Sequence, residues 1–384
     1  MMVIRVLALV LVSACWISDP GYRMPEGGTP GDGTVVDAPP VEFSSCLHLD
    51  ANCGKDAIGN DANDNCCNSP PLPGGTYLRG SDSATDILFK DSNSLATVSA
   101  FRLDKYEVTV GRFRAFVDAE MGTQEHPPQA NAGAHAKIRD SGWNPDWNTN
   151  LAVDRAALLK AINECAPVPA PSDERYPLIP TWNDSPGDRD AENRPMNCIT
   201  WYEAMAFCAW DGGYLPTEAE WIYAATGGSD QRAFPWSDPP GDTTLDPSRA
   251  SYGKGPQPDG TDECYGDGVP ACAVTDLLDV GSLPAGDGRW LQSDLTGNVG
   301  EWMLDYRDDP DDKDEDMQYF MPCTDCAQLT PVSSSNPRAL RGGSFSDHPE
   351  YLRVAKRGYV LPADRESDVG VRCARPAVAA AASK

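Results

Sequence analysis

Helix-start signals are the clearest pattern of polar and hydrophobic positions in this chain, and they lie between residues 195 and 228. Thr200 is followed by Glu203, and Thr217 by Glu220, each at the start of a largely apolar run. In such a capping box, two side chains satisfy backbone amides that the first helical turn leaves free. A glycine pair follows each run, and glycine commonly ends helices. The sequence therefore predicts two short helices in tandem.

Two weaker patterns precede these helices. Phe101 and Leu103 alternate with polar residues, which predicts a strand. Thr109 can cap a helix that places Phe113 and Phe116 on one face.

The rest of the chain shows little periodicity. Residues 119–190 are polar and contain several prolines, which predicts long loops with one short helix near residues 156–165. From residue 229 to residue 375, turns alternate with short apolar segments and isolated tryptophans. The expected fold class is α+β with low regular secondary structure, and most tryptophans are expected to fill its core.

The first residues have the order of an export signal. Arg5 precedes an apolar run at residues 6–12, and small residues lead to Cys15. We predict a signal peptide over residues 1–14. The segment at residues 12–15 resembles a lipobox, in which Cys15 would carry lipid, and buried acyl chains would then anchor the protein to a membrane. An ordinary secretory signal with an incidental cysteine is the alternative. The predicted location is the bacterial cell envelope.

Composition divides the remaining chain into segments. Residues 15–45 are rich in Gly, Pro, Asp and Thr and predict a flexible tether. Residues 46–71 hold four cysteines with too few apolar residues for a core, which predicts a small disulfide-bonded segment. The main domain is expected over residues 72–375, followed by a disordered tail at 376–384.

Charge and cysteine content narrow the function. The chain has 31 basic and 58 acidic residues and a net charge of −27, which would repel nucleic-acid phosphates, so nucleic acid is excluded as a partner. Setting Cys15 aside from the 13 cysteines leaves an even number, as disulfides in an oxidising compartment require.

Seven motifs occur in a fixed order along the main domain. They are PGGTYLRG at 73–80, LDKYEVTVGRFRAFV at 103–117, WYEAMAFCAWDGGYLPTEAEW at 201–221, FPW at 234–236, DLTGNVGEW at 294–302, RGGSF at 341–345 and GVRCAR at 370–375. Together they resemble the formylglycine-generating enzymes, or sulfatase-modifying factors, over about residues 72–375. The resemblance implies a domain related to C-type lectins that calcium and disulfides stabilise.

The resemblance implies a structural calcium ion in the GNVGEW segment. Family members bind it there through an asparagine side chain, backbone carbonyls and a glutamate, and Asn298, Val299, Gly300 and Glu301 fall on those positions. Oxygen ligands suit this hard cation. Gly300 replaces the family's usual tryptophan, and a hydrogen-bonded turn without metal is the alternative.

The same resemblance implies that the family's oxidation chemistry is missing. Family members oxidise a substrate cysteine with two cysteines and copper after the GGS motif. Here Asp347 stands at the first of these positions, and the stretch with the second is shortened. A carboxylate is a hard donor and cannot replace a copper-binding thiolate, so no copper is expected. Four scattered histidines also disfavour the iron site of other relatives.

The alternative hypothesis is a different reaction in the cleft that holds the active site of the family's enzymes. Asp347 and His348 could act as acid and base, and Ser344 lies nearby in the sequence. Arg353 and Arg357 could bind an anionic substrate. These five residues are the candidate catalytic residues.

The resemblance also implies a disulfide between Cys208 and Cys373, whereas Ala225 and Val354 occupy the positions of a second family bridge. The other cysteines can pair as Cys165 with Cys198, Cys264 with Cys272, and Cys323 with Cys326, and the connectivity of Cys46, Cys53, Cys66 and Cys67 stays open. The spacing of Cys323 and Cys326 also occurs in redox proteins, but no helix start is evident there, so a loop disulfide is expected.

Three functions remain in view. The first is a binding or structural module on a membrane surface, with a peptide, protein or glycan as ligand. The second is a protein-modifying enzyme of the same superfamily with altered chemistry. The third is a partner in the folding or maturation of another exported protein.

Overall fold

The computed structural model describes residues 43–46, 66–80, 94–165, 179–184, 192–256, 262–307, 319, 321–331 and 336–377. The chain divides into two units, Met1–Pro40 and Val41–Lys384, and all described residues belong to the second. The predicted signal peptide, the lipidation residue Cys15, the tether up to residue 42, Cys53 and the tail from residue 378 lie outside the described residues. None of the described helices is long and apolar enough to cross a membrane.

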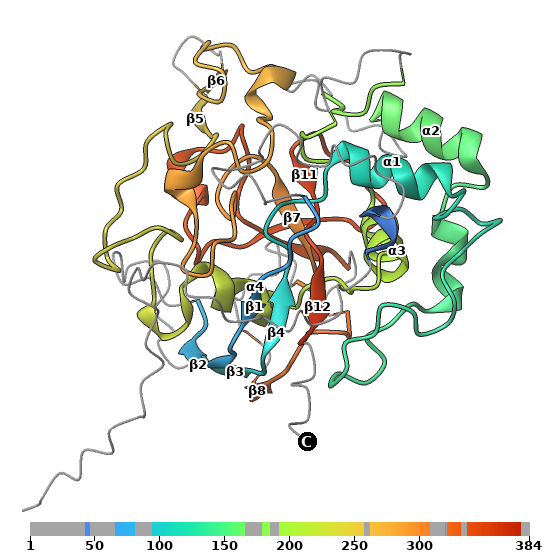
Figure 1. Ribbon diagram of the computed structural model, residues 1–384, viewed down its shortest axis with the longest axis horizontal. Helices are drawn as coiled ribbons and strands as arrows, with labels where there is room; N and C mark the ends of the chain where they lie inside the picture. The colour runs from blue at the N-terminus through green and yellow to red at the C-terminus, as the bar shows by residue number, and fades with distance from the viewer. Residues whose placement is uncertain are drawn as a thin grey trace, which may run out of the picture. The chain divides into compact units, whose positions relative to one another are not determined.

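The helices begin where capping residues place them. The α-helices are α1 (Val110–Asp118), α2 (Arg155–Glu164), α3 (Trp201–Trp210) and α4 (Glu218–Ala225) (Figure 1). Both predicted capping boxes are formed: the Thr200 hydroxyl accepts from the Glu203 amide at 3.2 Å, and the Thr217 hydroxyl accepts from the Glu220 amide at 3.0 Å. The Thr109 hydroxyl caps α1 in the same way. These helix predictions are confirmed.

Short 3-10 helices connect these elements. They are η1 (Ser44–Cys46), η2 (Pro145–Asn150), η3 (Gly228–Asp230), η4 (Val274–Asp276), η5 (Pro284–Gly286) and η6 (Pro349–Tyr351).

The strands are short and form small sheets. They are β1 (Pro71–Leu72), β2 (Gly75–Leu78), β3 (Leu95–Val98), β4 (Phe101–Leu103), β5 (Gly253–Pro256), β6 (Asp262–Cys264), β7 (Gly300–Tyr306), β8 (Cys323–Thr324), β9 (Arg338–Arg341), β10 (Gly358–Val360), β11 (Val369–Gly370) and β12 (Ala374–Pro376). Their orders are β1-β4-β12, β10-β9-β7-β11, β2-β3-β8 and β5-β6. The strand predicted at Phe101 and Leu103 therefore pairs with the last strand described. The domain is mixed α+β with low regular structure, as predicted.

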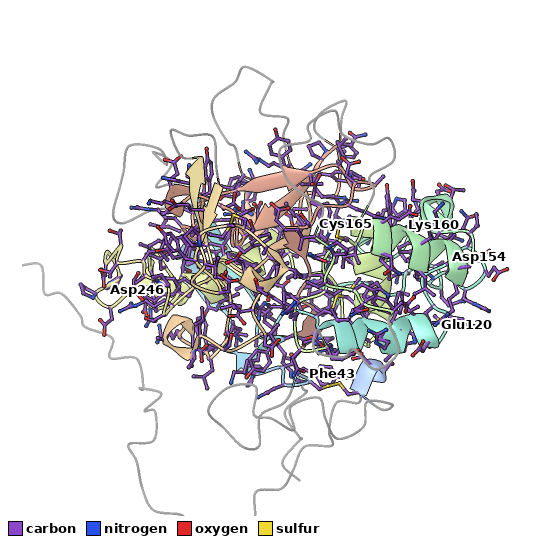
Figure 2. All side chains as sticks on the ribbon, turned by 90° about the horizontal axis from the view of Figure 1, so that it is seen from above. Phe43, Glu120, Asp154, Lys160, Cys165 and Asp246 are labelled. Atoms are coloured by element: carbon purple, nitrogen blue, oxygen red, sulfur yellow. A yellow bond between two sulfur atoms is a disulfide. The ribbon has the colours of Figure 1, made fainter. Side chains whose placement is uncertain are left out.

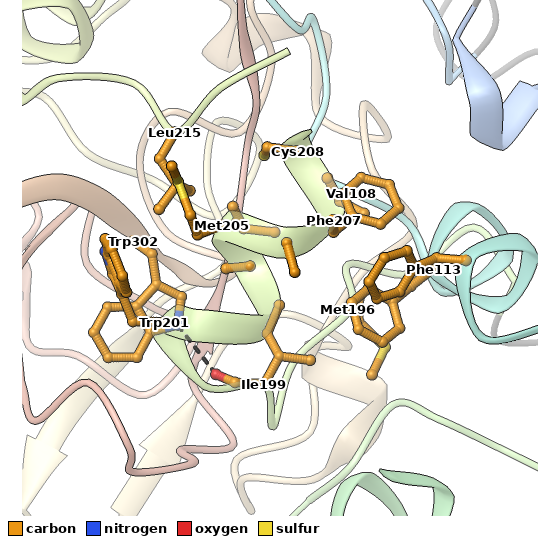
Figure 3. Packing of buried hydrophobic residues seen from close by; sticks show 14 of the residues in the cluster. Val108, Phe113, Met196, Ile199, Trp201, Met205, Phe207, Cys208, Leu215 and Trp302 are labelled. Carbon is orange, nitrogen blue, oxygen red and sulfur yellow. Dashed lines mark hydrogen bonds between the residues drawn. The ribbon is translucent and has the colours of Figure 1, made fainter. Parts of the chain in front are cut away.

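Tryptophans fill the core around α3. Trp201, the first residue of α3, and Trp302 on β7 are both 0 % exposed, and Figure 3 shows them in one cluster with Met205 and Leu215. Their ring nitrogens still find acceptors, because Trp302 donates to the Ile199 carbonyl at 3.1 Å and Trp201 donates to the Met303 carbonyl at 2.8 Å. Truncating a buried ring of this size typically costs about 3–5 kcal/mol.

Buried arginines tie distant segments to this core. Arg112 on α1 and Arg375 on β12 both bind the carboxylates of Asp104 and Asp211, and all four residues are 0 % exposed. Removing one partner from such a buried pair typically costs 3–5 kcal/mol. This network fixes the start of the domain to its end.

The end of the predicted tether and the cysteine-rich segment pack onto the main domain, so Phe43 and Ser45 are buried at η1 rather than part of a flexible tether. The guanidinium carbon of Arg375 lies 3.7 Å from the ring centroid of Phe43, which is labelled in Figure 2. The backbone amide of Ser45 donates to Asp211 Oδ1 at 2.7 Å. Cys46 is bonded to Cys67, and Arg112 donates to the Cys66 carbonyl at 3.2 Å. The described part of this segment therefore shares the buried arginine network.

Candidate functional site

The candidate site begins in the loop that follows β9. Gly342 and Gly343 have φ angles of 97° and 66°, a region that favours glycine. A side chain at position 343 would place its Cβ 2.6 Å from Leu352 Cδ2. This glycine turn directs the chain from the buried strand into Ser344 and Asp347.

Ser344 and Asp347 form a closed hydrogen-bonded turn. Both the backbone amide and the hydroxyl of Ser344 donate to Asp347 Oδ2, at 2.9 and 3.0 Å. The Ser346 hydroxyl lies 3.2 Å from the Ser344 hydroxyl. Burial raises the pKa of Asp347, although the hydrogen bonds from Ser344 act in the opposite direction.

A second carboxylate, which sequence reasoning missed, belongs to the same site. Asp368 immediately precedes β11, and its backbone carbonyl accepts from the Gly300 amide at 2.8 Å. Burial, followed by the negative charges of Asp347 and Glu366, raises the pKa of Asp368 to about 7. Two carboxyl groups that repel each other in a desolvated place favour retention of one proton near neutral pH. The only sequence signal was an acidic residue directly before the GVRCAR motif.

The other predicted catalytic residues have different partners. His348 is exposed and its Nδ1 accepts from the Glu350 amide at 3.4 Å, at the start of η6. Arg357 donates to the two carboxylate oxygens of Glu218 at 2.6 and 2.8 Å. Arg353 is half-buried. The guanidinium of Arg357 is thus engaged by Glu218 rather than by Asp347.

Glu218 is the centre of a buried ion-pair cluster behind the loop. Arg341 also donates to its Oε1, from Nε at 2.9 Å and from Nη2 at 2.6 Å. Burial alone would raise the pKa of Glu218, but the charges of Arg341 and Arg357 outweigh it and lower this pKa to about 2. The cluster holds β9 and the loop after η6 against the start of α4.

The predicted calcium segment has protein partners for its polar groups. The Asn298 amide group donates to Glu107 Oε2 at 2.7 Å, and its oxygen accepts from the Leu278 amide at 3.0 Å. The Glu301 carboxylate accepts from Trp221 Nε1 at 2.8 Å and from Arg372 Nη2 at 2.9 Å. The side chains of Asn298 and Glu301 therefore serve separate partners.

Several carboxylates lie around this segment. Three carboxylates, those of Glu107, Asp294 and Glu301, share the single guanidinium of Arg372. Burial, followed by the charge of Asp294, raises the pKa of Glu107 well above its usual range, and burial raises that of Asp294 to about 6. In the described part of the chain, no three His, Cys, Asp or Glu side chains converge in metal-binding geometry. Carboxylate oxygens are the ligands that calcium prefers, but those of Glu107 and Glu301 accept hydrogen bonds from protein groups in this structure.

All described cysteines are in disulfides. The structure has the pairs Cys165–Cys198, Cys208–Cys373, Cys264–Cys272 and Cys323–Cys326, besides Cys46–Cys67. Cys66 is also disulfide-bonded. Cys323 lies in β8 rather than at a helix start, so its surroundings differ from those of thioredoxin-type sites. Ala225 and Val354 are both buried in one apolar cluster.

Comparison with known proteins identifies relatives. The chain is 28% identical to the formylglycine-generating enzyme of Thermomonospora curvata, over 79% of this chain and 91% of the relative. It is 28% identical to the inactive C-alpha-formylglycine-generating enzyme 2 of Mus musculus, over 80% of this chain and 85% of the relative. It is 27% identical to the hercynine oxygenase of Mycolicibacterium smegmatis, over 79% of this chain and 60% of the relative.

The chain also aligns with a solved structure and matches a family model. The structure of PvdO from Pseudomonas aeruginosa aligns with a TM-score of 0.46 and 20% identity, over 80% of this chain and 93% of that chain. The model of the sulfatase-modifying factor enzyme 1-like domain matches residues 56–377. The chain therefore belongs to the family of sulfatase-modifying factor enzyme 1-like domains.

Proposed function

We propose that this chain does not carry out copper-dependent cysteine oxidation and acts as a lipid-anchored binding module of the cell envelope. The observation that carries the proposal is that all 11 cysteines in the described residues are disulfide-bonded. Copper(I) prefers thiolate ligands, and a disulfide sulfur supplies no thiolate. The family includes both active enzymes and inactive members, so membership is compatible with this function.

The turn at Ser344 and Asp347 supports a binding function. The resemblance puts Asp347 at the first active cysteine, where this structure has a carboxylate held by two hydrogen bonds from Ser344. Asp368 lies close enough for the charge of Asp347 to raise its pKa, so two carboxyl groups share this site. We propose that it recognises a cationic group on its peptide, protein or glycan ligand, because such a group would relieve the repulsion between the two carboxyl groups.

Oxygen uptake tests the absence of oxidation. The mature protein is incubated with copper and a thiol peptide, with the Thermomonospora curvata enzyme as the positive control. We expect no oxygen consumption above the rate of free copper and no loss of the peptide thiol by mass spectrometry. Copper-dependent turnover by this chain would overturn the proposal.

The Asp347 and Asp368 pair also favours a second candidate, an enzyme with acid–base chemistry. A carboxyl group with a pKa of about 7 can donate a proton at neutral pH while its neighbour accepts one. If this second candidate is correct, a substrate screen should find an activity, and both Asp347→Asn and Asp368→Asn should change the pH profile of that activity. An activity that survives both substitutions would exclude these residues as its acid and base.

The predicted lipobox is the basis for the proposed membrane anchor, and mass spectrometry of the intact protein tests it. The intact mature protein, measured without reduction, should carry the mass of acyl chains at Cys15 and no free thiols. An unacylated chain that begins elsewhere would contradict the anchor without affecting the binding proposal.

A further inference from the structure

A buried arginine contacts one sulfur of the Cys323–Cys326 disulfide. The two cysteines are three residues apart, and Arg79 Nη1 donates to Cys326 Sγ at 3.5 Å. Arg79 Nη2 also donates to Met321 Sδ at 3.9 Å, and the guanidinium carbon lies 4.3 Å from the ring centroid of Tyr319. Because Arg79 is 1 % exposed, water screens its charge little.

The positive charge of Arg79 favours the reduced form of this pair. A neighbouring arginine stabilises a cysteine as its thiolate. In thiol–disulfide exchange, the sulfur that is more stable as a thiolate is also the better leaving group. The contact with Arg79 therefore makes Cys326 the better leaving sulfur of the two. Arg79 supplies the positive charge that a helix start supplies in thioredoxin-type sites.

The loop that carries the pair lies directly under the surface. Cys323 and Cys326 are 4 % and 6 % exposed, whereas Met321 is 45 % exposed and both Pro322 and Thr324 are exposed. Among the described strands, the two-residue β8 lies at the edge of its sheet and pairs only with β3. Local opening of a short edge strand costs less than unfolding of the domain. Such an opening would expose Cys323 to a thiol in solution.

The residue next to Cys326 keeps the loop in place when the disulfide opens. The Asp325 amide donates to the Thr97 carbonyl at 2.9 Å. The Asp325 carboxylate accepts from the amide and the hydroxyl of Ser99, at 2.6 and 2.8 Å. These bonds do not require the disulfide, so they hold the reduced cysteines near each other. The same bond can then form again without the entropic cost of closing a long loop.

We propose that Cys323 and Cys326 form a reversible redox site that accepts electrons from an external dithiol. One thiolate of the dithiol attacks Cys323 Sγ and forms a mixed disulfide. The bond to Cys326 breaks, and its electron pair stays on Cys326 Sγ beside Arg79. The second thiol of the dithiol loses its proton, attacks the mixed disulfide and releases Cys323. The dithiol becomes a disulfide, two electrons pass to the pair, and the two protons pass to the cysteines or to water.

Limited reduction of the folded mature protein tests the proposal. Dithiothreitol is added in increasing amounts without denaturant, free thiols are alkylated, and mass spectrometry of peptides identifies each opened bridge. The control is Cys264–Cys272, which is also local in sequence and includes the half-buried Cys272, so exposure alone would open it first. We expect Cys323–Cys326 to open before it while tryptophan fluorescence stays native, and to form again in glutathione disulfide. Earlier opening of Cys264–Cys272, or opening of Cys323–Cys326 only as the domain unfolds, would overturn the proposal.

Substitution of the arginine tests the cause. In glutathione buffers at pH 8, the equilibrium constant for reduction of the pair should fall about 5-fold in Arg79→Gln, because the thiolate loses its neighbouring charge. Arg289→Gln, at a 43% exposed arginine, should leave the constant unchanged. An unchanged constant in folded Arg79→Gln would refute the role of the charge. If Arg79→Gln does not fold, the order of opening in the wild type decides.

The redox site is independent of the proposed function. In the oxygen-uptake assay, the double variant Cys323→Ala/Cys326→Ala should behave as the wild type does. Copper-dependent turnover that persists in this variant would contradict the proposed function and leave the redox site unaffected.

Discussion

Replacing Glu218 by glutamine is the sharpest test of how this loop-rich domain is held together. The carboxylate is 2 % exposed and binds Arg341 and Arg357 at once. Glu218→Gln removes the charge and leaves two buried guanidinium groups without it. Breaking a buried pair in this way typically costs about 3–5 kcal/mol.

The pKa of Glu218 gives a second estimate of the same quantity. Its folded-state pKa of about 2 lies below the ordinary glutamate pKa of 4.5, which corresponds to about 3 kcal/mol of stabilisation. Because the folded pKa is lowered, this contribution is fully present above pH 4.5 and is lost as the pH falls toward 2. The two estimates agree.

Urea unfolding, followed by tryptophan fluorescence with disulfides intact, measures the difference between wild type and variant. We expect a loss of about 3 kcal/mol at pH 7 that shrinks below pH 4.5. The matched control is Glu263→Gln, whose partner Lys254 is 49% exposed, so water screens this ion pair and its loss should change the stability little. A loss below about 1 kcal/mol at pH 7, or one that is unchanged at pH 2.5, would refute the reasoning.

Three further predictions follow from other parts of the structure. Asp368→Asn should stabilise the protein by about 4 kcal/mol at pH 8, because a carboxyl pKa raised from 3.8 to about 7 destabilises the wild type increasingly between these two pH values and fully above pH 7. The gain should vanish toward pH 3.8 in urea titrations. Removing the Cys208–Cys373 bridge, with a sequence separation of 165, should lower the free energy of unfolding by about 5 kcal/mol. Removing Cys264–Cys272, with a separation of 8, should lower it by only about 2.5 kcal/mol in the same unfolding assay. Calcium should raise the Tm relative to chelator by several degrees in scanning calorimetry, and an unchanged Tm would show that Arg372 alone balances the neighbouring carboxylates.

Local signals in the sequence were sufficient for the helices. Thr200 and Glu203 lie three residues apart, so the atoms that form a capping box are brought together by the first helical turn alone. The same holds for Thr217, and for Thr109 at the start of α1. Such interactions depend on residues in one turn and need no knowledge of the rest of the chain.

Some disulfide pairs could be predicted from a short separation in the sequence, and another only from the family resemblance. Cys264 with Cys272 and Cys323 with Cys326 are close in sequence, so a short loop brings each pair together. Cys208 and Cys373 are 165 residues apart, and only the family resemblance identified them.

The candidate site depended on the tertiary structure. Ser344 and Asp347 interact within one turn, which the sequence made plausible, but Asp368 approaches them only because β11 pairs with β7. Arg357 was expected to face a substrate, yet it binds Glu218, which is 139 residues away in sequence.

What the sequence by itself determined were the helix starts, the mixed fold class and the family. Only the tertiary structure decided which buried carboxylate pairs with which buried arginine. The difference has a physical cause: capping depends on neighbours in sequence, whereas a buried charge is stabilised by whatever opposite charge the packed chain brings near it. Arg372 therefore has Glu301 as a partner, and Arg338 has no carboxylate among the described residues.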